Sequence, residues 1–222
     1  MKWIFIVILA FTTVISCSNS SDFDTGEIKA IKMLRETLIA QNTSTVLFDT
    51  RKVITRKKID DAKIPVLFVE LENGQNGTLT LFPGQGVGKT WLGADGATIT
   101  LENGLIKATR GMRNDVMASA SSMPPWSRIK NAFEYTRQIS YLGGDNQTYF
   151  KKFDCIVKRY NKQSTITIFD ETFDTQEFLE VCIHNKEKLE NRYFVDDKNV
   201  VRRSNQYHGP ALGYLTIERL DR

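Results

Sequence analysis

The clearest structural pattern in the chain is the stretch Ala97-Thr98-Ile99-Thr100-Leu101-Glu102-Asn103-Gly104-Leu105-Ile106-Lys107-Ala108-Thr109. Two runs that alternate apolar and polar residues flank the pair Asn103-Gly104. Because Asn-Gly tolerates the positive φ angles of a type I′ turn, the stretch predicts a β-hairpin. The letters LENG also occur at residues 71–74, between two further strand-like runs, which indicates the same turn chemistry.

Strand-like runs of similar length continue on both sides of this hairpin. They cover residues 66–71, 78–82, 133–141, 153–157, 164–169, 178–183, 190–195, 200–206 and 212–220. Short strands at such intervals, with few helices, predict a mainly β fold: an antiparallel β-sandwich or an open barrel-like sheet. Residues 119–126, with two prolines and four small residues, predict a surface connection between two halves of one domain.

Only two helices are expected. Apolar residues recur at spacings of three and four over residues 24–41, which predicts an N-terminal amphipathic helix. A short second helix is predicted over residues 57–62, with Thr55 as its N-cap and Pro65 after its end.

Composition limits the classes of protein to consider. The chain has 222 residues, 41% of them hydrophobic, with a net charge of +4, two histidines and three cysteines. This supports one globular domain and excludes a disordered chain or a disulfide-dense miniprotein. The charge is too weak and scattered to indicate a nucleic-acid partner. No Cys/His grouping has metal-ligand spacing, so no metal is expected.

The N-terminus predicts export and a lipid anchor. Lys2 precedes an apolar run over residues 3–11, too short for a comfortable membrane span. Val14-Ile15-Ser16-Cys17 resembles a bacterial lipobox, in which Cys17 receives acyl chains such as palmitate and the signal is cut just before it. We therefore expect a signal peptide over residues 1–16, a tether over 17–23 and one β-rich domain over 24–222. Ser18 favours the outer membrane, with the protein facing the periplasm.

A glycine-rich stretch, Gly84-Gln85-Gly86-Val87-Gly88-Lys89-Thr90, partly matches a phosphate-binding loop. The motif needs a glycine where the chain has Pro83, and it needs a helix where a strand and a turn follow. We therefore expect no nucleotide and no other cofactor.

Cys155 and Cys182 remain once Cys17 is lipidated. In an oxidising compartment they are expected to form a disulfide. Strand alternation complicates this prediction, because Cys182 shares a face with Glu180, opposite the apolar Val181 and Ile183. A pair of free thiols is the alternative.

Five residues are candidates for contact with a polysaccharide or a partner protein: Trp91, Trp126, Phe194, Arg202 and Tyr207. The ordinary alternative is that most of these aromatic residues belong to the core or to turns. Arg202 and Arg203 are adjacent on a predicted strand, so they should point to opposite faces. His184 and His208 are expected at the surface or rim, without a catalytic partner.

Three stretches together resemble the group 4 capsule polysaccharide lipoprotein (GfcB/YjbF) family. They are residues 90–101 (TWLGADGATITL), residues 104–116 with Arg110-Gly111-Met112 and Asp115-Val116, and the C-terminal signature NRYFVD, VRRSNQ and Gly209-Pro210. Phe194 stands where the family usually has tryptophan, and Gln206-Tyr207-His208 replaces a more typical Gln-Trp.

The resemblance implies a β-rich outer-membrane lipoprotein in capsule or exopolysaccharide assembly or export, bound to a secretion protein or to the polymer. The family supplies no catalytic residues, and no nucleophile or carboxylate pair stands out in the chain. We therefore expect no enzyme activity. The alternative is a periplasmic enzyme acting on the polymer, such as a glycosidase, which would need two carboxylates about 5–9.5 Å apart across a groove.

Overall fold

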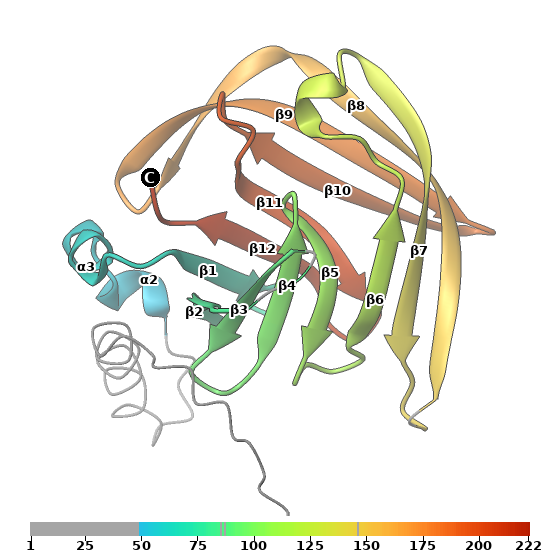
Figure 1. The fold of residues 1–222 in the computed structure, drawn as a ribbon, viewed down its shortest axis with the longest axis horizontal. Coiled ribbons are helices and arrows are strands. Elements are labelled where there is room, and N and C mark those ends of the chain that lie inside the picture. Colours follow the sequence, from blue (N-terminus) through green and yellow to red (C-terminus); the bar gives the residue numbers. More distant parts are fainter. Residues whose placement is uncertain (1–48, 85, 87, 146) are drawn as a thin grey trace, which may run out of the picture.

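The computed structural model describes residues 49–84, 86, 88–145 and 147–222 (Figure 1). The predicted signal peptide, the lipidation site Cys17, the tether and the helix over 24–41 lie outside the described residues.

One antiparallel sheet of twelve strands dominates the described part of the chain, and it curls into a nearly closed barrel (Figure 1). Its strand order is β5-β4-β3-β2-β1-β12-β11-β10-β9-β8-β7-β6. The strands are β1 (Val66–Leu71), β2 (Asn76–Phe82), β3 (Lys89–Gly93), β4 (Thr98–Glu102), β5 (Leu105–Arg110), β6 (Val116–Ser121), β7 (Ala132–Leu142), β8 (Thr148–Ile168), β9 (Glu171–His184), β10 (Glu187–Val195), β11 (Val201–Gly209) and β12 (Gly213–Arg219). The mainly β prediction is confirmed, in its barrel-like form.

The β4–β5 hairpin forms as its sequence predicts. Asn103 and Gly104 both have positive φ, at 51° and 83°, and they join Glu102 to Leu105 in a two-residue turn. Gly104 is also needed for packing, since a Cβ atom at this position would lie 2.3 Å from a methyl group of Val201. The hairpin is thereby fitted against the start of β11.

Two predictions about the middle of the chain are wrong. Residues 119–121 are not part of a loop but end strand β6, where the small side chain of Ser119 accepts a hydrogen bond from Arg137. The segments 153–157 and 164–169 are not separate strands. They belong to the single strand β8, whose register with β9 shifts between Arg159 and Gln163.

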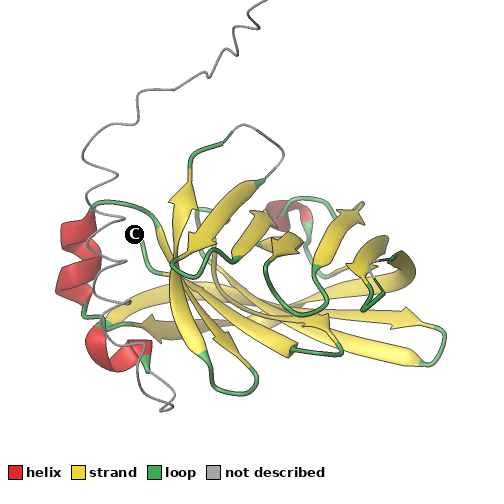
Figure 2. Ribbon diagram, turned by 90° about the horizontal axis from the view of Figure 1, so that it is seen from below, coloured by secondary structure: helices red, strands yellow, loops and turns green. Residues whose placement is uncertain are grey.

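Two helices, α2 (Thr50–Val53) and α3 (Arg56–Ala62), lie at one side of the sheet (Figure 2). As predicted, Thr55 caps α3, accepting a hydrogen bond from the amide of Lys58. Beneath α3 lies a small apolar cluster on the outside of the barrel, and Arg56 donates to the carbonyls of Ile168 and Leu220 beside it. The cluster consists of Ile59, Val66, Phe68, Ile166, Ile168 and Leu220.

The barrel interior mixes apolar and charged side chains. On β9 the buried, inward positions are Phe178, Glu180 and Cys182, whereas Val181 and Ile183 point outward. Ile183 is 50% exposed, while the carboxylate of Glu180 is fully buried. Hydrophobicity alone would assign the two faces of this strand the wrong way round.

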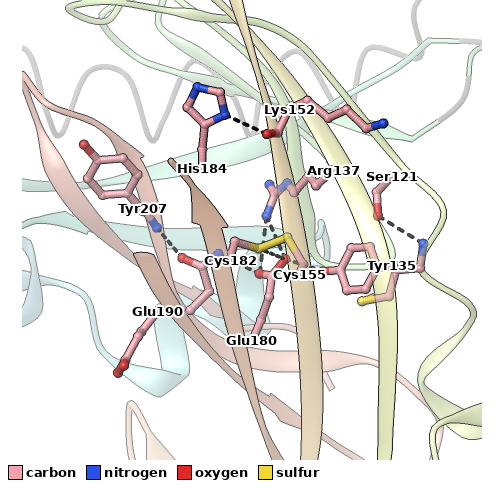
Figure 3. Close-up of a disulfide and its surroundings, with 12 residues drawn as sticks. Ser121, Tyr135, Arg137, Lys152, Cys155, Glu180, Cys182, His184, Glu190 and Tyr207 are labelled. Atoms are coloured by element: carbon pink, nitrogen blue, oxygen red, sulfur yellow. Dashed lines mark hydrogen bonds and ion pairs between the residues drawn. A yellow bond between two sulfur atoms is a disulfide. The ribbon is translucent and has the colours of Figure 1, made fainter. Parts of the chain in front are cut away.

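Glu180 is the centre of the interior network (Figure 3). Its carboxylate accepts hydrogen bonds from the hydroxyl groups of Tyr135 and Tyr193, the latter at 2.7 Å, and from Asn191 Nδ2 at 2.6 Å. Arg137 Nη1 lies 3.3 Å from both carboxylate oxygens. Burial alone would raise the pKa of Glu180, but Arg137 and these hydrogen bonds outweigh it and lower the pKa below its ordinary value. The buried glutamate is therefore ionised and paired.

The network also supports β5, whose edge faces the gap in the barrel. Arg137 Nη2 donates to the carbonyl of Ile106 at 3.2 Å, and Gln206 Oε1 accepts from the amide of Ile106 at 3.0 Å. Gln206 Nε2 donates to the carbonyl of Gly104 at 2.7 Å. No backbone ladder joins β5 to β6 among the described residues. Interior side chains therefore satisfy backbone groups that a neighbouring strand would otherwise pair.

Cys155 and Cys182 form a disulfide across β8 and β9, where they are directly opposite residues (Figure 3). Both side chains point into the barrel, and Cys182 Sγ lies 3.4 Å from Glu180 Oε1. Strand alternation does not oppose the disulfide, because Cys182 shares the inward face of β9 with the charged residue Glu180.

His208 is fully buried, which overturns the expectation of a surface or rim residue. Its Nε2 lies 3.0 Å from Thr109 Oγ1, and that hydroxyl donates to Asp115 Oδ1 at 2.9 Å. His208 Nδ1 has no hydrogen-bond partner among the described residues. Burial lowers the pKa of His208 and outweighs the opposing effect of Asp115.

Replacing Arg137 with methionine should lower the free energy of unfolding by about 3–5 kcal/mol, because the carboxylate of Glu180 is then buried without a cation. Urea denaturation followed by circular dichroism measures this loss. The double variant Arg137→Met/Glu180→Gln should recover most of it, since no buried charge remains. Lys188→Met, which removes an exposed ion pair with Glu190, is the control and should leave the unfolding midpoint in place. A single variant as stable as the wild type would contradict the role assigned to the pair.

His208 should make the fold sensitive to mild acid. Below the unfolded pKa of about 6.5, the unfolded chain takes up a proton that the folded chain refuses, so stability falls as the pH falls. The contribution is at most about 1.4 kcal/mol per pH unit. In His208→Gln the slope of stability between pH 6.5 and 5 should decrease, measured by denaturant titrations at each pH. An identical slope in both proteins would show that another group is responsible.

Candidate ligand site at the mouth of the barrel

Two hollows lie at one open end of the barrel. The larger has a volume of about 640 Å³ and the smaller about 430 Å³. Each combines residues of the interior core with residues from the turns at this end of the strands, and Asn199 borders both. The loop over residues 196–200, between β10 and β11, therefore separates the two hollows. Barrel mouths are common positions for ligand sites.

Trp126 forms the floor of the larger hollow. It begins the short 3-10 helix η1 (Trp126–Arg128), and its ring lies 4.9 Å from that of Phe178 and 4.8 Å from that of Tyr193. Its indole Nε1 donates to the carbonyl of Asn103 at 2.8 Å. Trp126 thus connects the hollow to the β4–β5 turn, and only 3% of it is exposed.

Asp196 holds the separating loop in place. Its Oδ1 accepts from the backbone amides of Lys198 and Val200 at 2.9 and 2.8 Å, and its Oδ2 accepts from Arg202 Nε at 2.6 Å. The guanidinium of Arg202 also lies 4.6 Å from the ring centre of Phe173, and only 4% of its side chain is exposed. Arg202 therefore shapes the wall of the hollow rather than presenting a free charge.

Three exposed cations line the larger hollow and form no ion pair in the described ranges: Lys130, Arg159 and Lys198. A fourth cation, Arg222, is shared between Glu171 and Asp60. The hollow therefore combines an aromatic floor with a rim of available hydrogen-bond donors.

The smaller hollow is lined by inward side chains of the barrel. Leu67, Trp91 and Ile217 form apolar walls, and Ser204 adds a buried hydroxyl group. The indole N–H of Trp91 is buried and has no hydrogen-bond partner within the described residues.

The structure brings together three of the five residues suggested for ligand contact. Trp126 and Arg202 line the larger hollow and Trp91 lines the smaller one. Phe194 instead points outward and packs against the cluster under α3, and Tyr207 packs edge-on against Tyr214 with ring centres 5.4 Å apart. Neither Phe194 nor Tyr207 lines either hollow. Arg202 and Arg203 do point to opposite faces, since Arg203 pairs with Glu218.

Sequence reasoning missed the cations of the larger hollow and the polar network beneath it. Lys130 and Arg159 lie near each other because β7 pairs with β8, whereas Lys198 comes from the β10–β11 loop and reaches the same hollow through the curvature of the sheet. Arg137 did carry a detectable pattern, because it is a charged residue on the same strand face as the apolar residues Tyr135 and Ile139, two positions away on each side.

No helix among the described residues is long and apolar enough to cross a membrane. The twelve-stranded sheet is a nearly closed barrel with a filled interior and two ligand-sized hollows at one mouth. The chain belongs to the family described as group 4 capsule polysaccharide lipoprotein GfcB/YjbF, whose model matches residues 32–220.

A solved structure, the hypothetical lipoprotein YmcC from Escherichia coli K12, has the same fold. The two share 18% sequence identity with a TM-score of 0.71, and the match covers 86% of this chain and 95% of that one. No curated protein matches the sequence.

Removing the Asp196 carboxylate should loosen the loop between the hollows. In Asp196→Ala, the amides of Lys198 and Val200 lose their acceptor and Arg202 loses its buried partner. The free energy of unfolding should fall by about 3 kcal/mol, because a buried charge is left unpaired. Hydrogen exchange followed by NMR should show faster exchange at these amides than at those of the β8–β9 ladder. Unchanged protection in the loop would refute this role for Asp196.

Proposed function

We propose that this family member is an outer-membrane lipoprotein, anchored through Cys17 and facing the periplasm, which binds capsule polysaccharide or exopolysaccharide during assembly or export without catalysing a reaction. Its family, named for capsule polysaccharide lipoproteins, supports the polysaccharide connection. The lipobox supports the anchor, since two or more acyl chains hold a protein lastingly at a membrane.

The observation that carries the proposal is the composition of the larger hollow. Trp126 and Phe178 supply an apolar floor, and three exposed cations supply donors around it. Sugars combine C–H surfaces with hydroxyl groups, and acidic sugars add carboxylates that lysine and arginine bind. An acidic polysaccharide therefore fits this hollow better than an apolar molecule does.

Two carboxylates of the larger hollow hold its wall and so are not available for catalysis. Asp196 is occupied by Arg202 and two backbone amides, and Glu171 pairs with Arg222. Asp174 accepts from Thr165 Oγ1. A glycosidase needs one carboxylate to act as an acid and another as a nucleophile or base across the bond. Two of the four carboxylates that line the hollow are committed to ion pairs, so the enzyme alternative depends on Asp174 and the exposed Asp197, which form no ion pair in the described ranges.

A partner protein is the second candidate, and one surface feature favours it. Val181 and Ile183 on β9 and Ile156 on β8 point outward as an apolar strip, and Phe150 on β8 is 69% exposed. Exposed apolar patches often bind other proteins. This strip lies on the outside of the barrel wall, so it is separate from the hollow.

Reversing two charges should weaken polysaccharide binding at least tenfold. In Arg159→Glu/Lys198→Glu, two unpaired cations of the larger hollow become anions that repel an acidic polymer. Affinity electrophoresis in gels containing the native polysaccharide should show retardation of the wild type and at least a tenfold weaker apparent affinity for this variant. The control, Lys152→Glu/Lys158→Glu, makes the same charge change on the outer face of β8 and should bind as the wild type does.

The same variants test the function in cells. A deletion strain complemented with the wild type should restore surface and released polysaccharide, whereas the hollow variant should not. Cys17→Ala should also fail if anchoring is required. Polysaccharide output that does not change on deletion would overturn the proposed function, and equal retardation of both double variants would remove the hollow from it.

A further inference from the structure

The smaller hollow differs in chemistry from its larger neighbour. Its volume of about 430 Å³ falls within the range of about 300–1,000 Å³ that is typical of small-molecule sites. Five aliphatic residues line it: Leu67, Leu101, Val200, Val201 and Ile217. Such walls favour a small apolar group such as a methyl, since each buried CH₂ or CH₃ contributes about 0.8 kcal/mol.

Beside these walls lie two buried hydrogen-bond donors that donate to no acceptor among the described residues. Ser204 Oγ accepts from Gln206 Nε2 at 2.9 Å, so its hydroxyl hydrogen remains to donate. Trp91, 2% exposed, has an indole N–H with no partner in the described structure. Buried donors are normally satisfied, so an unused donor in the wall of a hollow indicates that a bound molecule supplies the acceptor.

Two of the three charged residues that line this hollow are paired, whereas the exposed Lys89 forms no ion pair in the described ranges. The guanidinium of Arg219 binds Asp221 through Nε and Nη2 at 2.8–3.0 Å, and Glu102 pairs with Lys107 at 2.7 Å. The exposed side chain of Asn103 stands at the opening, where its amide group can both donate and accept. Asn103 and Lys89 can therefore bind a polar group in this hollow, and a carbonyl oxygen is a suitable acceptor for both.

A methyl group, a carbonyl acceptor and a neutral N–H occur together in an acetamido group. We propose that the smaller hollow binds the acetamido group of an N-acetylated sugar residue. Its methyl contacts Leu101 and Val201, its carbonyl accepts from the buried donors, and Asn103 binds its N–H. The inference rests on the proposed function, because the N-acetylated sugar is one unit of a polysaccharide whose neighbouring sugar units occupy the larger hollow. Asn199 borders both hollows, so the polysaccharide would pass from one hollow to the other beside this residue.

The test compares two neutral oligosaccharides that differ only at carbon 2. Tri-N-acetylchitotriose carries an acetamido group there, and cellotriose carries a hydroxyl with the same linkage. Isothermal titration calorimetry with the full chain should show that chitotriose binds at least tenfold more tightly than cellotriose. Saturation-transfer NMR should show the acetamido methyl as its most strongly saturated signal. Equal affinity for the two sugars, or binding of neither, would overturn the inference.

Two variants test whether the preference for chitotriose over cellotriose arises in the smaller hollow. Ser204→Ala removes a donor, and Leu101→Trp fills the hollow from a half-buried position. If one variant does not fold, the other still tests the assignment. Each should reduce the chitotriose preference to less than threefold, with circular dichroism confirming the fold. A preference unchanged in either folded variant would place acetamido binding elsewhere and overturn the assignment.

The larger-hollow variant Arg159→Glu/Lys198→Glu separates the two proposals. It should lose the acidic polysaccharide while keeping its preference for neutral chitotriose. If the wild type retains the polysaccharide but shows no preference for chitotriose, only the acetamido inference fails. If the wild type shows the preference but not the retention, the proposed function fails.

Discussion

The ion pair between Glu180 and Arg137 is the constraint on which the rest of the barrel depends. A charged pair with no solvent exposure stabilises a fold only when every remaining donor and acceptor is satisfied. Here two tyrosines and an asparagine donate the remaining hydrogen bonds to the carboxylate, while Ser119 and the carbonyl of Ile106 accept hydrogen bonds from the guanidinium. The pair therefore fixes β7, β9 and β10 relative to one another and holds β5 at the gap in the sheet.

This filled interior explains why the hollows lie at the mouth and not in the lumen. Polar side chains, the disulfide and the ring of Trp126 occupy the centre of the barrel. The ends of the strands and the turns between them form the surfaces of the two hollows. Because the interior is packed independently of the rim, substitutions in the turns at the rim can change ligand preference without altering the fold.

The sequence predicted those parts of the structure that depend on local chemistry. The Asn103-Gly104 hairpin and the Thr55 cap follow from conformational preferences of a few neighbouring residues. The inward face of β9 could not be predicted in this way, because Val181 and Ile183 are the more hydrophobic residues and yet face solvent. Their orientation depends on Arg137, 43 residues from Glu180 along the chain. Likewise, Lys198 joins Arg159 and Lys130 only through the curvature of the sheet, whereas Trp91, Trp126 and Arg202 were recognisable by residue type.

The pairing of β1 with β12 has a consequence for when the protein can fold. The gap in the barrel lies between β5 and β6, which only residues 111–115 separate in the chain, so bringing these strands together costs little loop entropy. In contrast, Val69 lies opposite Ile217, so the central pairing of the sheet joins strands near opposite ends of the described chain. The sheet is complete only when both ends are present on the same side of a membrane. A chain that is exported through a membrane therefore finishes folding only after its last strand has crossed.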